Sequence, residues 1–191
     1  MVVDDRNRAA KRAARRVPQR AAITVRPSPL DPSQGLLRLG PLTVRCALGR
    51  SGVTARKREG DGATPRGDHA VLSAFVRRER WGMPPRGALS MQAIGAEDGW
   101  CDAPEDPSYN RPVSLPHRAS AEAMSREDQL YDAVVVLDYN MTRRVRGVGS
   151  AIFFHVARAG YAPTEGCIAV SHRDMRRLLP HLARGRIVRV L

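Results

Sequence analysis

The chain has 191 residues and a mass of 21.0 kDa, which suits a single domain with or without a tail. Hydrophobic residues make up 42% and charged residues 27%, which is ordinary globular usage and excludes wholesale disorder. No stretch approaches the ~20 consecutive apolar residues of a transmembrane helix, so an integral membrane protein of that kind is excluded. The net charge is +13, from 32 Lys and Arg against 19 Asp and Glu, which suits an anionic partner.

Almost half of this positive charge lies in the first 26 residues. The segment carries eight basic side chains against Asp4 and Asp5, a net +6 that leaves +7 for the other 165 residues. It is rich in Arg and Ala and has no apolar stripe, so we expect a flexible basic arm over residues 1–26 and one domain over 27–191. No apolar h-region follows the basic start, and no secretory signal peptide is therefore predicted.

From Ile23 onward the pattern is one of short strands separated by turns. Gly40-Pro41 between two apolar runs predicts a hairpin with arms at 36–39 and 42–48. Further strands are expected at residues 70–76, 89–94, 133–137, 151–154 and 187–191. The run Ala133 to Leu137 is apolar on both faces, which is typical of a central strand. The expected fold class is therefore mainly β.

Two short helices are also expected. One or two helical turns are predicted over Ser120 to Asp128. The second helix is predicted from Ser171 to about Ala183, because Ser171 and Asp174 resemble a capping box and the apolar residues that follow share one helical face. Pro180 is expected to kink or shorten this helix, since proline cannot donate a backbone hydrogen bond.

The three cysteines and five histidines do not show the spacing of known metal sites. No Cys-x-x-Cys occurs, so no structural zinc site, no other metal and no cofactor are predicted. Cys46 lies in an apolar run, where we expect a small buried hydrophobic side chain. Cys101 follows Trp100 in a polar stretch and has no base beside it in the sequence.

Cys167 differs from the other two because it sits in a Gly-containing turn that runs into a strand. His155 lies twelve positions earlier, at the end of a predicted strand, and two adjacent strands would bring the thiol and the imidazole together. A nucleophilic thiolate needs a neighbouring base or cation, and His is the usual one. Gly166 leaves room for a substrate carbonyl, which backbone amides around Cys167 would stabilise as an oxyanion. On spacing alone, a satisfied core His and a buried Cys are the more common arrangement.

The most informative pattern joins residues 149–155 (GSAIFFH) to residues 163–170 (PTEGCIAV). Together they resemble the active-site signature of the L,D-transpeptidases, the YkuD or ErfK/YbiS family. Residues 57–67 (KREGDGATPRG) resemble a hairpin of that family, and the segments 106–111 and 139–140 fit one of its branches. The resemblance covers about residues 35–191 in the right order. It implies a YkuD-like β-sandwich or barrel with one or two short helices.

The resemblance implies acyl transfer between the stem peptides of peptidoglycan. Cys167 matches the nucleophile that forms a thioester, and His155 matches the base that activates it. An amine of a second stem then resolves the thioester into a cross-link of the 3,3 or 1,3 type. Glu165 and Gly166 match the oxyanion segment through their backbone, and Thr164 is expected to hold the nucleophile turn. Donor and acceptor stems are the implied partners, and the cell envelope or periplasm is the implied location.

The sequence departs from the family pattern near the nucleophile. Thr-Glu-Gly-Cys stands in place of Ser-His-Gly-Cys, and Ala169 replaces an Arg or Asn that helps to hold substrate in relatives. Elsewhere, a polar segment offers further candidate substrate-binding residues: Tyr109, Asn110 and Arg111. The fork of an Arg side chain suits a stem carboxylate, whereas a solvated loop with one packed Tyr is the alternative.

Two other functions stay open. If water resolves the thioester, the same Cys–His pair gives an L,D-carboxypeptidase or amidase. In a different class, the +13 charge is compatible with a basic nucleic-acid-binding module. Aromatic residues are only 5% of the chain, too few for a base-stacking surface, so no specific nucleic acid is predicted. The oligomeric state is not predicted from the sequence.

Overall fold

A computed structural model describes residues 22–82 and 89–191 of the chain. Most of the predicted basic arm lies outside these residues, but its end does not. Strand β1 (Ile23–Pro27) pairs on both sides within the main sheet, and Ile23 and Val25 are fully buried. Residues 23–26, which the sequence analysis assigned to the arm, therefore belong to the sheet, because two inward-facing apolar side chains are buried there.

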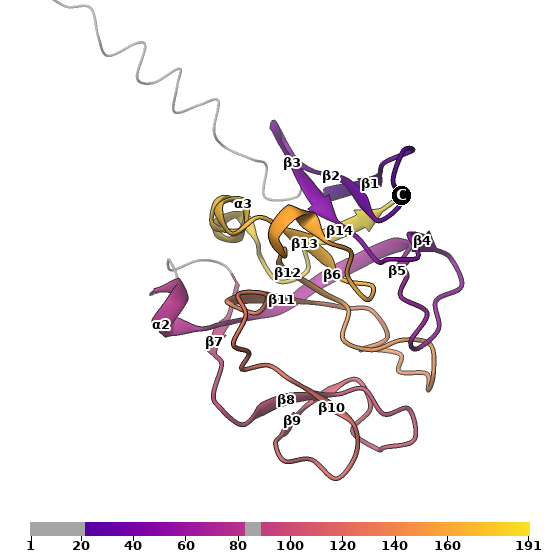
Figure 1. Cartoon of the computed structure of the whole chain (residues 1–191), viewed down its shortest axis with the longest axis vertical. Helices are drawn as coiled ribbons and strands as arrows, with labels where there is room; N and C mark the ends of the chain where they lie inside the picture. Colours follow the sequence, from indigo (N-terminus) through magenta and orange to yellow (C-terminus); the bar gives the residue numbers. More distant parts are fainter. Residues whose placement is uncertain (1–21, 83–88) are drawn as a thin grey trace, which may run out of the picture.

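The main sheet closes on itself. Its other strands are β2 (Gln34–Leu39), β3 (Leu42–Ala47), β6 (Gly67–Val76), β7 (Met91–Ala93), β11 (Ala133–Leu137), β12 (Phe153–Val156), β13 (Ile168–Val170) and β14 (Ile187–Val190). Neighbours follow the order β11-β12-β13-β3-β2-β1-β14-β6, and β6 pairs again with β11. These eight strands form a barrel (Figure 1), with β7 added beside β6, which confirms the predicted mainly β fold.

Alternation of side chains sets the inside and outside of this barrel. In β2, Leu37 and Leu39 are fully buried while Leu36 is 54% exposed. The predicted hairpin is confirmed, with Leu39 opposite Leu42 and with Gly40 in the left-handed region that glycine adopts without strain. A one-residue slip would exchange the two faces, so burial specifies the register.

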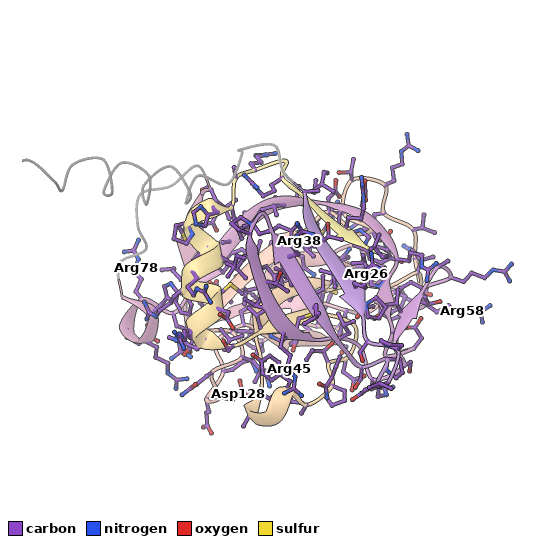
Figure 2. The ribbon with its side chains drawn as sticks, turned by 90° about the horizontal axis from the view of Figure 1, so that it is seen from above. Arg26, Arg38, Arg45, Arg58, Arg78 and Asp128 are labelled. Carbon is purple, nitrogen blue, oxygen red and sulfur yellow. The ribbon has the colours of Figure 1, made fainter. Side chains whose placement is uncertain are left out.

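Outward positions of the same strands carry part of the positive charge. Arg26, Arg38 and Arg45 are exposed and project from the first three strands (Figure 2). They come from three different strands and lie among other surface side chains. The positive charge of the first three strands therefore lies on the outward face of the sheet. Arginine occupies these positions because a charged side chain is rarely buried in a core.

Strand β11 separates two hydrophobic clusters. Val135 and Leu137 pack inside the barrel, whereas Val134 and Val136 pack outside it with Trp100. All five residues of β11 are buried, which confirms the predicted central strand. The two-faced burial explains why this run is apolar without alternation.

A small three-stranded sheet provides the other side of the outer cluster. It contains β8 (Asp98–Cys101), β9 (Arg111–Ser114) and β10 (Ala121–Ala123), in the order β10-β8-β9, and lies below the barrel in Figure 1. The predicted helix over 120–128 is wrong, because residues 121–123 pair with β8 instead. Pairing with β8 and burial of Met124 beside Trp100 override the weak helical preference of this polar segment.

The second predicted helix is confirmed with a shorter span. Helix α3 (His172–Leu178) begins at Ser171, whose hydroxyl accepts a 3.1 Å hydrogen bond from the Asp174 amide. Pro180 lies in the 3₁₀ turn η2 (Leu179–His181), which replaces the last turns of the expected helix. The remaining elements are short: β4 (Val53–Thr54), β5 (Thr64–Pro65), α2 (Arg78–Trp81) and η1 (Ala159–Tyr161). Among the described residues, no helix combines the length and apolarity that a membrane span requires.

Two adjacent leucines test the assignment of inside and outside in β2. Leu37→Ala should lower the free energy of unfolding by about 2–5 kcal/mol, because it leaves a cavity in a closed core. Leu36→Ala, the matched control on the exposed face, should change it by no more than about 0.5 kcal/mol. Urea unfolding followed by circular dichroism measures both, and equal effects would contradict the register of β2.

Candidate active site

The pairing of β12 with β13 brings Cys167 and His155 to the same face of the sheet. The two strands are parallel, with Phe154 opposite Ile168 and His155 opposite Ala169. Phe154 and Ile168 point into the barrel, so the residues that alternate with them point outward. Cys167, which immediately precedes β13, therefore lies one diagonal step from His155 on the outer face.

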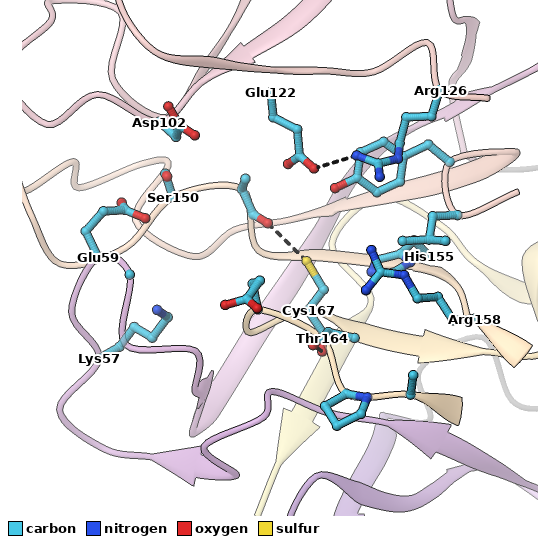
Figure 3. Close-up of a pocket in the computed structure, with 17 residues that line it drawn as sticks. Lys57, Glu59, Asp102, Glu122, Arg126, Ser150, His155, Arg158, Thr164 and Cys167 are labelled. Carbon is cyan, nitrogen blue, oxygen red and sulfur yellow. Dashed lines mark hydrogen bonds and ion pairs between the residues drawn. The ribbon is translucent and has the colours of Figure 1, made fainter. Parts of the chain in front are cut away.

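Both side chains line one cavity of about 510 Å³ (Figure 3). The barrel face and the nucleophile turn form one side, and residues from the small sheet and its connections form the other. Cys167 is only 8% exposed and His155 only 3%. The volume is that of a typical small-molecule or peptide-binding pocket, and the two candidate catalytic groups lie in its wall.

The Cys167 thiol is neutral in this arrangement. Its Sγ–H donates to the Ala151 carbonyl at 3.1 Å, and the Phe153 amide donates to Sγ at 3.3 Å. Burial raises the pKa of Cys167 to about 12, and the Glu122 charge contributes a smaller increase. The hydrogen bond from the Phe153 amide and the charge of Lys57 act in the opposite direction and lower the pKa. The sulfur therefore keeps its proton until a base takes it.

His155 is held as a neutral imidazole with one defined tautomer. Its Nδ1 lies 2.8 Å from the Val156 carbonyl, which can only accept, so Nδ1 carries the proton and Nε2 carries the lone pair. Burial lowers the pKa of His155 to about 4, so the ring is uncharged at neutral pH. The edge of the Tyr131 ring packs against it, with the centroids 5.4 Å apart. Nε2 is thus available as a proton acceptor.

Thr164 fixes the turn that carries Cys167. Its hydroxyl donates to the Cys167 carbonyl at 2.7 Å and accepts from the Gly166 amide at 3.1 Å. The Thr164 amide donates to the Leu48 carbonyl at 2.9 Å, and the Thr164 carbonyl accepts from the Arg50 amide at 2.8 Å. The turn is therefore anchored to the segment that follows β3.

Gly166 and Glu165 occupy different environments in this turn. Gly166 has a φ of +135°, and an added Cβ would lie 2.8 Å from the Ala63 carbonyl oxygen, so only glycine fits without displacement. Its amide, expected in the oxyanion hole, donates to Thr164 instead. The Glu165 side chain is 78% exposed at the cavity rim and forms an ion pair with Arg50.

Tyr109 and Asn110 support the site from behind. The Tyr109 hydroxyl donates to Glu59 and accepts from the Gly149 amide at 3.0 Å. The Asn110 side chain accepts from the Trp100 indole at 3.0 Å and from the Ala151 amide at 3.1 Å. Both residues are almost fully buried and neither lines the cavity.

The Arg111 side chain also forms its hydrogen bonds within the protein. Its guanidinium donates to the Asn110 carbonyl at 2.9 Å and to the Met141 carbonyl at 2.7 Å. Arg111 does not line this cavity, so its expected contact with a stem carboxylate stays a prediction. Because Asn110 also donates to the Tyr139 and Asn140 carbonyls, the segment 109–111 ties the small sheet to the loops beside Cys167.

The cavity contains charged side chains that were not predicted from the sequence. Glu122 pairs with Arg126 at 3.2 Å, and Arg126 lies over the Tyr131 ring at 5.2 Å. Asp102 and Arg158 also line the cavity (Figure 3). Residues 120–128 were expected to form one or two helical turns, so the closeness of Glu122 to Cys167 became visible only when β10 was placed opposite β8.

The sequence comparison identifies the fold that carries this site. The YkuD family model, described as the L,D-transpeptidase catalytic domain, matches residues 34–190. The chain belongs to this family. The match covers both the strand with His155 and the turn with Cys167, and it confirms the resemblance that the sequence motifs indicated. Among curated proteins, no match to this YkuD domain is found.

Solved structures that match this chain share little sequence identity with it and have longer chains. Bd1075 of Bdellovibrio bacteriovorus is 14% identical with a TM-score of 0.44, and the alignment covers 90% of this chain and 48% of that one. L,D-transpeptidase 1 of Mycobacterium tuberculosis is 13% identical with a TM-score of 0.37, covering 89% and 62%. An L,D-transpeptidase from Mycobacterium smegmatis is 16% identical with a TM-score of 0.40, covering 90% and 59%. The YkuD chain thus spans between about half and three-fifths of their length.

The neutral state of Cys167 predicts how its alkylation depends on pH. Between pH 7 and 10 the rate with iodoacetamide should rise about tenfold per pH unit without levelling, because only the thiolate reacts and its pKa is about 12. Peptide mass spectrometry of quenched samples measures the rate at each cysteine. Cys46 and Cys101 are fully buried internal controls and should stay unlabelled in the native protein. A plateau below pH 9 would show that the resting sulfur is already a thiolate.

Proposed function

We propose that this YkuD domain is a peptidoglycan L,D-transpeptidase that cross-links stem peptides through a thioester on Cys167. The observation that carries the proposal is the β12–β13 register, which sets a thiol and an imidazole in one cavity of a family member. A stem peptide is a short peptide that carries free carboxylates and amines. A cavity of about 510 Å³ that is lined by both positive and negative side chains suits one end of such a peptide.

In the first step, Sγ of Cys167 attacks the carbonyl carbon of the donor peptide bond. The thiol proton moves to Nε2 of His155 as the S–C bond forms, because both groups are neutral before the substrate arrives. The Phe153 amide stays bonded to sulfur, and the Glu165 and Cys167 amides are assigned to the oxyanion. The C–N bond then breaks, and His155 gives its proton to the departing amine.

In the second step, the amine of an acceptor stem attacks the thioester. Nε2 of His155 takes a proton from the attacking nitrogen, the C–S bond breaks, and the proton returns to Cys167. The new amide bond is the cross-link, and the thiol again faces the Ala151 carbonyl. Water in place of the amine would give hydrolysis by the same steps, so the acceptor decides the reaction type.

Glu122 is the group that we assign to the acceptor amine. Its carboxylate lines the cavity, and its charge reaches the Cys167 sulfur, whose pKa it raises. Burial raises the pKa of Glu122 itself, whereas the Tyr131 hydroxyl and Arg126 stabilise its charged form. A partly buried carboxylate attracts an ammonium strongly, because little water screens it. An arriving ammonium would therefore be held next to the thioester, where it loses one proton to solvent and then attacks as the free amine. The substrate also implies a place of action in the cell envelope.

Purified disaccharide tetrapeptides test the reaction. The protein should convert them to dimers, and mass spectrometric fragmentation of the dimer identifies a 3,3 or 1,3 bond. Cys167→Ala should abolish dimer formation and the covalent carbapenem adduct, because no other described cysteine lines the cavity. Its fold should be retained, since the side chain is small. An adduct that persists in Cys167→Ala would refute the nucleophile, and trimmed monomers alone would favour the carboxypeptidase.

Removing the charge of Glu122 tests the acceptor assignment separately. Glu122→Gln should lower dimer formation about 10- to 100-fold, the effect of losing one charge-assisted hydrogen bond, while carbapenem acylation changes by no more than about threefold. Glu105→Gln is the matched control, because Glu105 is exposed, pairs with Arg146 on the surface and does not line the cavity. Equal losses in acylation and in transfer would instead give Glu122 a role in the donor step.

A further inference from the structure

A second group of reactive side chains lies on the other face of the small sheet. Trp100 packs into the outer cluster, so its neighbour Cys101 points to the opposite side of β8. There the Cys101 thiol, the Asp106 carboxylate and the His117 imidazole converge, with the three ligand-type atoms all within 4.8 Å of one another. Cys101 is fully buried and Asp106 is 7% exposed. None of the three takes part in the proposed reaction.

The His117 ring is left with an unsatisfied nitrogen. Its Nε2 is buried and has no hydrogen-bond partner in the part of the chain that the structure describes. The nearest carboxylate oxygen, Oδ1 of Asp106, is 3.6 Å away, which is too long for a hydrogen bond. A buried polar atom without a partner costs free energy, so a ligand between Nε2 and this oxygen would stabilise the fold.

Asp106 is oriented for such a ligand. Its Oδ1 accepts from the Ser108 amide at 2.7 Å, and its Oδ2 accepts from Arg118 at 2.9 Å. Hydrogen bonds of this kind fix the direction of metal-binding carboxylates in proteins.

We propose that Cys101, Asp106 and His117 form a zinc site. A thiolate, an imidazole and a carboxylate are the three side-chain ligands that Zn²⁺ takes, and three protein ligands leave a fourth position for water. Binding releases the Cys101 thiol proton as the S–Zn bond forms, so the charge and the atoms balance. Tetrahedral zinc holds such ligand atoms roughly 3.3–3.5 Å apart, which the cluster reaches by closing about 1 Å.

The site would connect three segments of the small sheet. Cys101 is the last residue of β8, whereas Asp106 and His117 belong to the connections on either side of β9. An ion would join these three segments, and the next residue after Cys101, Asp102, lines the catalytic cavity. The sequence analysis predicted no metal because the ligands are spaced by 5 and 11 residues and include only one cysteine.

Metal binding is best measured on the full chain with Cys167→Ala, because Cys167 and His155 would otherwise offer a second thiolate and imidazole. After treatment with a chelator, this protein should take up one equivalent of Zn²⁺ by elemental analysis. With Co²⁺ it should show a thiolate-to-cobalt charge-transfer band in the near ultraviolet. Zinc at a hundredfold excess over its Kd should raise the Tm by roughly 5–10 °C.

Adding Cys101→Ala should remove the cobalt band, and adding His117→Gln should lower zinc uptake at least tenfold. Cys46→Ala, which removes a buried thiol far from the cluster in the sequence, should retain both signals. Far-ultraviolet circular dichroism establishes that each variant is folded. The proposal is overturned if the Cys167→Ala protein takes up no stoichiometric zinc, or if it binds Co²⁺ without a thiolate band. These two outcomes require no Cys101 or His117 variant and do not depend on transpeptidase activity.

Discussion

The parallel pairing of β12 with β13 is the constraint on which the site depends. Phe154 and Ile168 face each other inside the barrel, where both are fully buried. Their burial specifies which face receives the alternating residues, and the outer face receives His155 and Cys167. A register shift of one residue in either strand would turn His155 or Cys167 toward the core. It would also expose the apolar side chain, Phe154 or Ile168, that the core now buries. The same hydrophobic burial that stabilises the barrel thus assembles the candidate catalytic pair.

Burial also determines the protonation state of that pair. Removing water raises the pKa of Cys167 and lowers the pKa of His155, so both shifts favour the neutral forms. The charged thiolate–imidazolium form of the pair is therefore disfavoured in the protein without substrate. Hydrogen bonds hold the neighbouring backbone in place. Thr164 orients the Cys167 carbonyl, and Asn110 anchors the Ala151 segment that contacts the thiol.

The small sheet is where sequence and structure differ most. Residues 120–128 carry polar side chains at spacings compatible with a helix, but their partner, β8, lies about twenty residues earlier and supplies backbone hydrogen bonds. The segment 109–111 was expected to contact substrate because its side chains are polar. Those side chains instead form hydrogen bonds within the protein, mostly to segments distant in the chain, and sequence alone does not report which partner satisfies a polar group.

Local patterns in the sequence determined most of the barrel strands, the hairpin at Gly40, the N-cap of α3 at Ser171, and the candidate reacting side chains at Cys167 and His155. These follow from alternation, turn chemistry and capping, which act over a few residues. Only the tertiary structure decided that β10 is a strand, that Glu122 lies in the same cavity as Cys167, and that Cys101, Asp106 and His117 converge. Each of these depends on pairing between segments distant in the chain, where burial and backbone hydrogen bonds outweigh local preference.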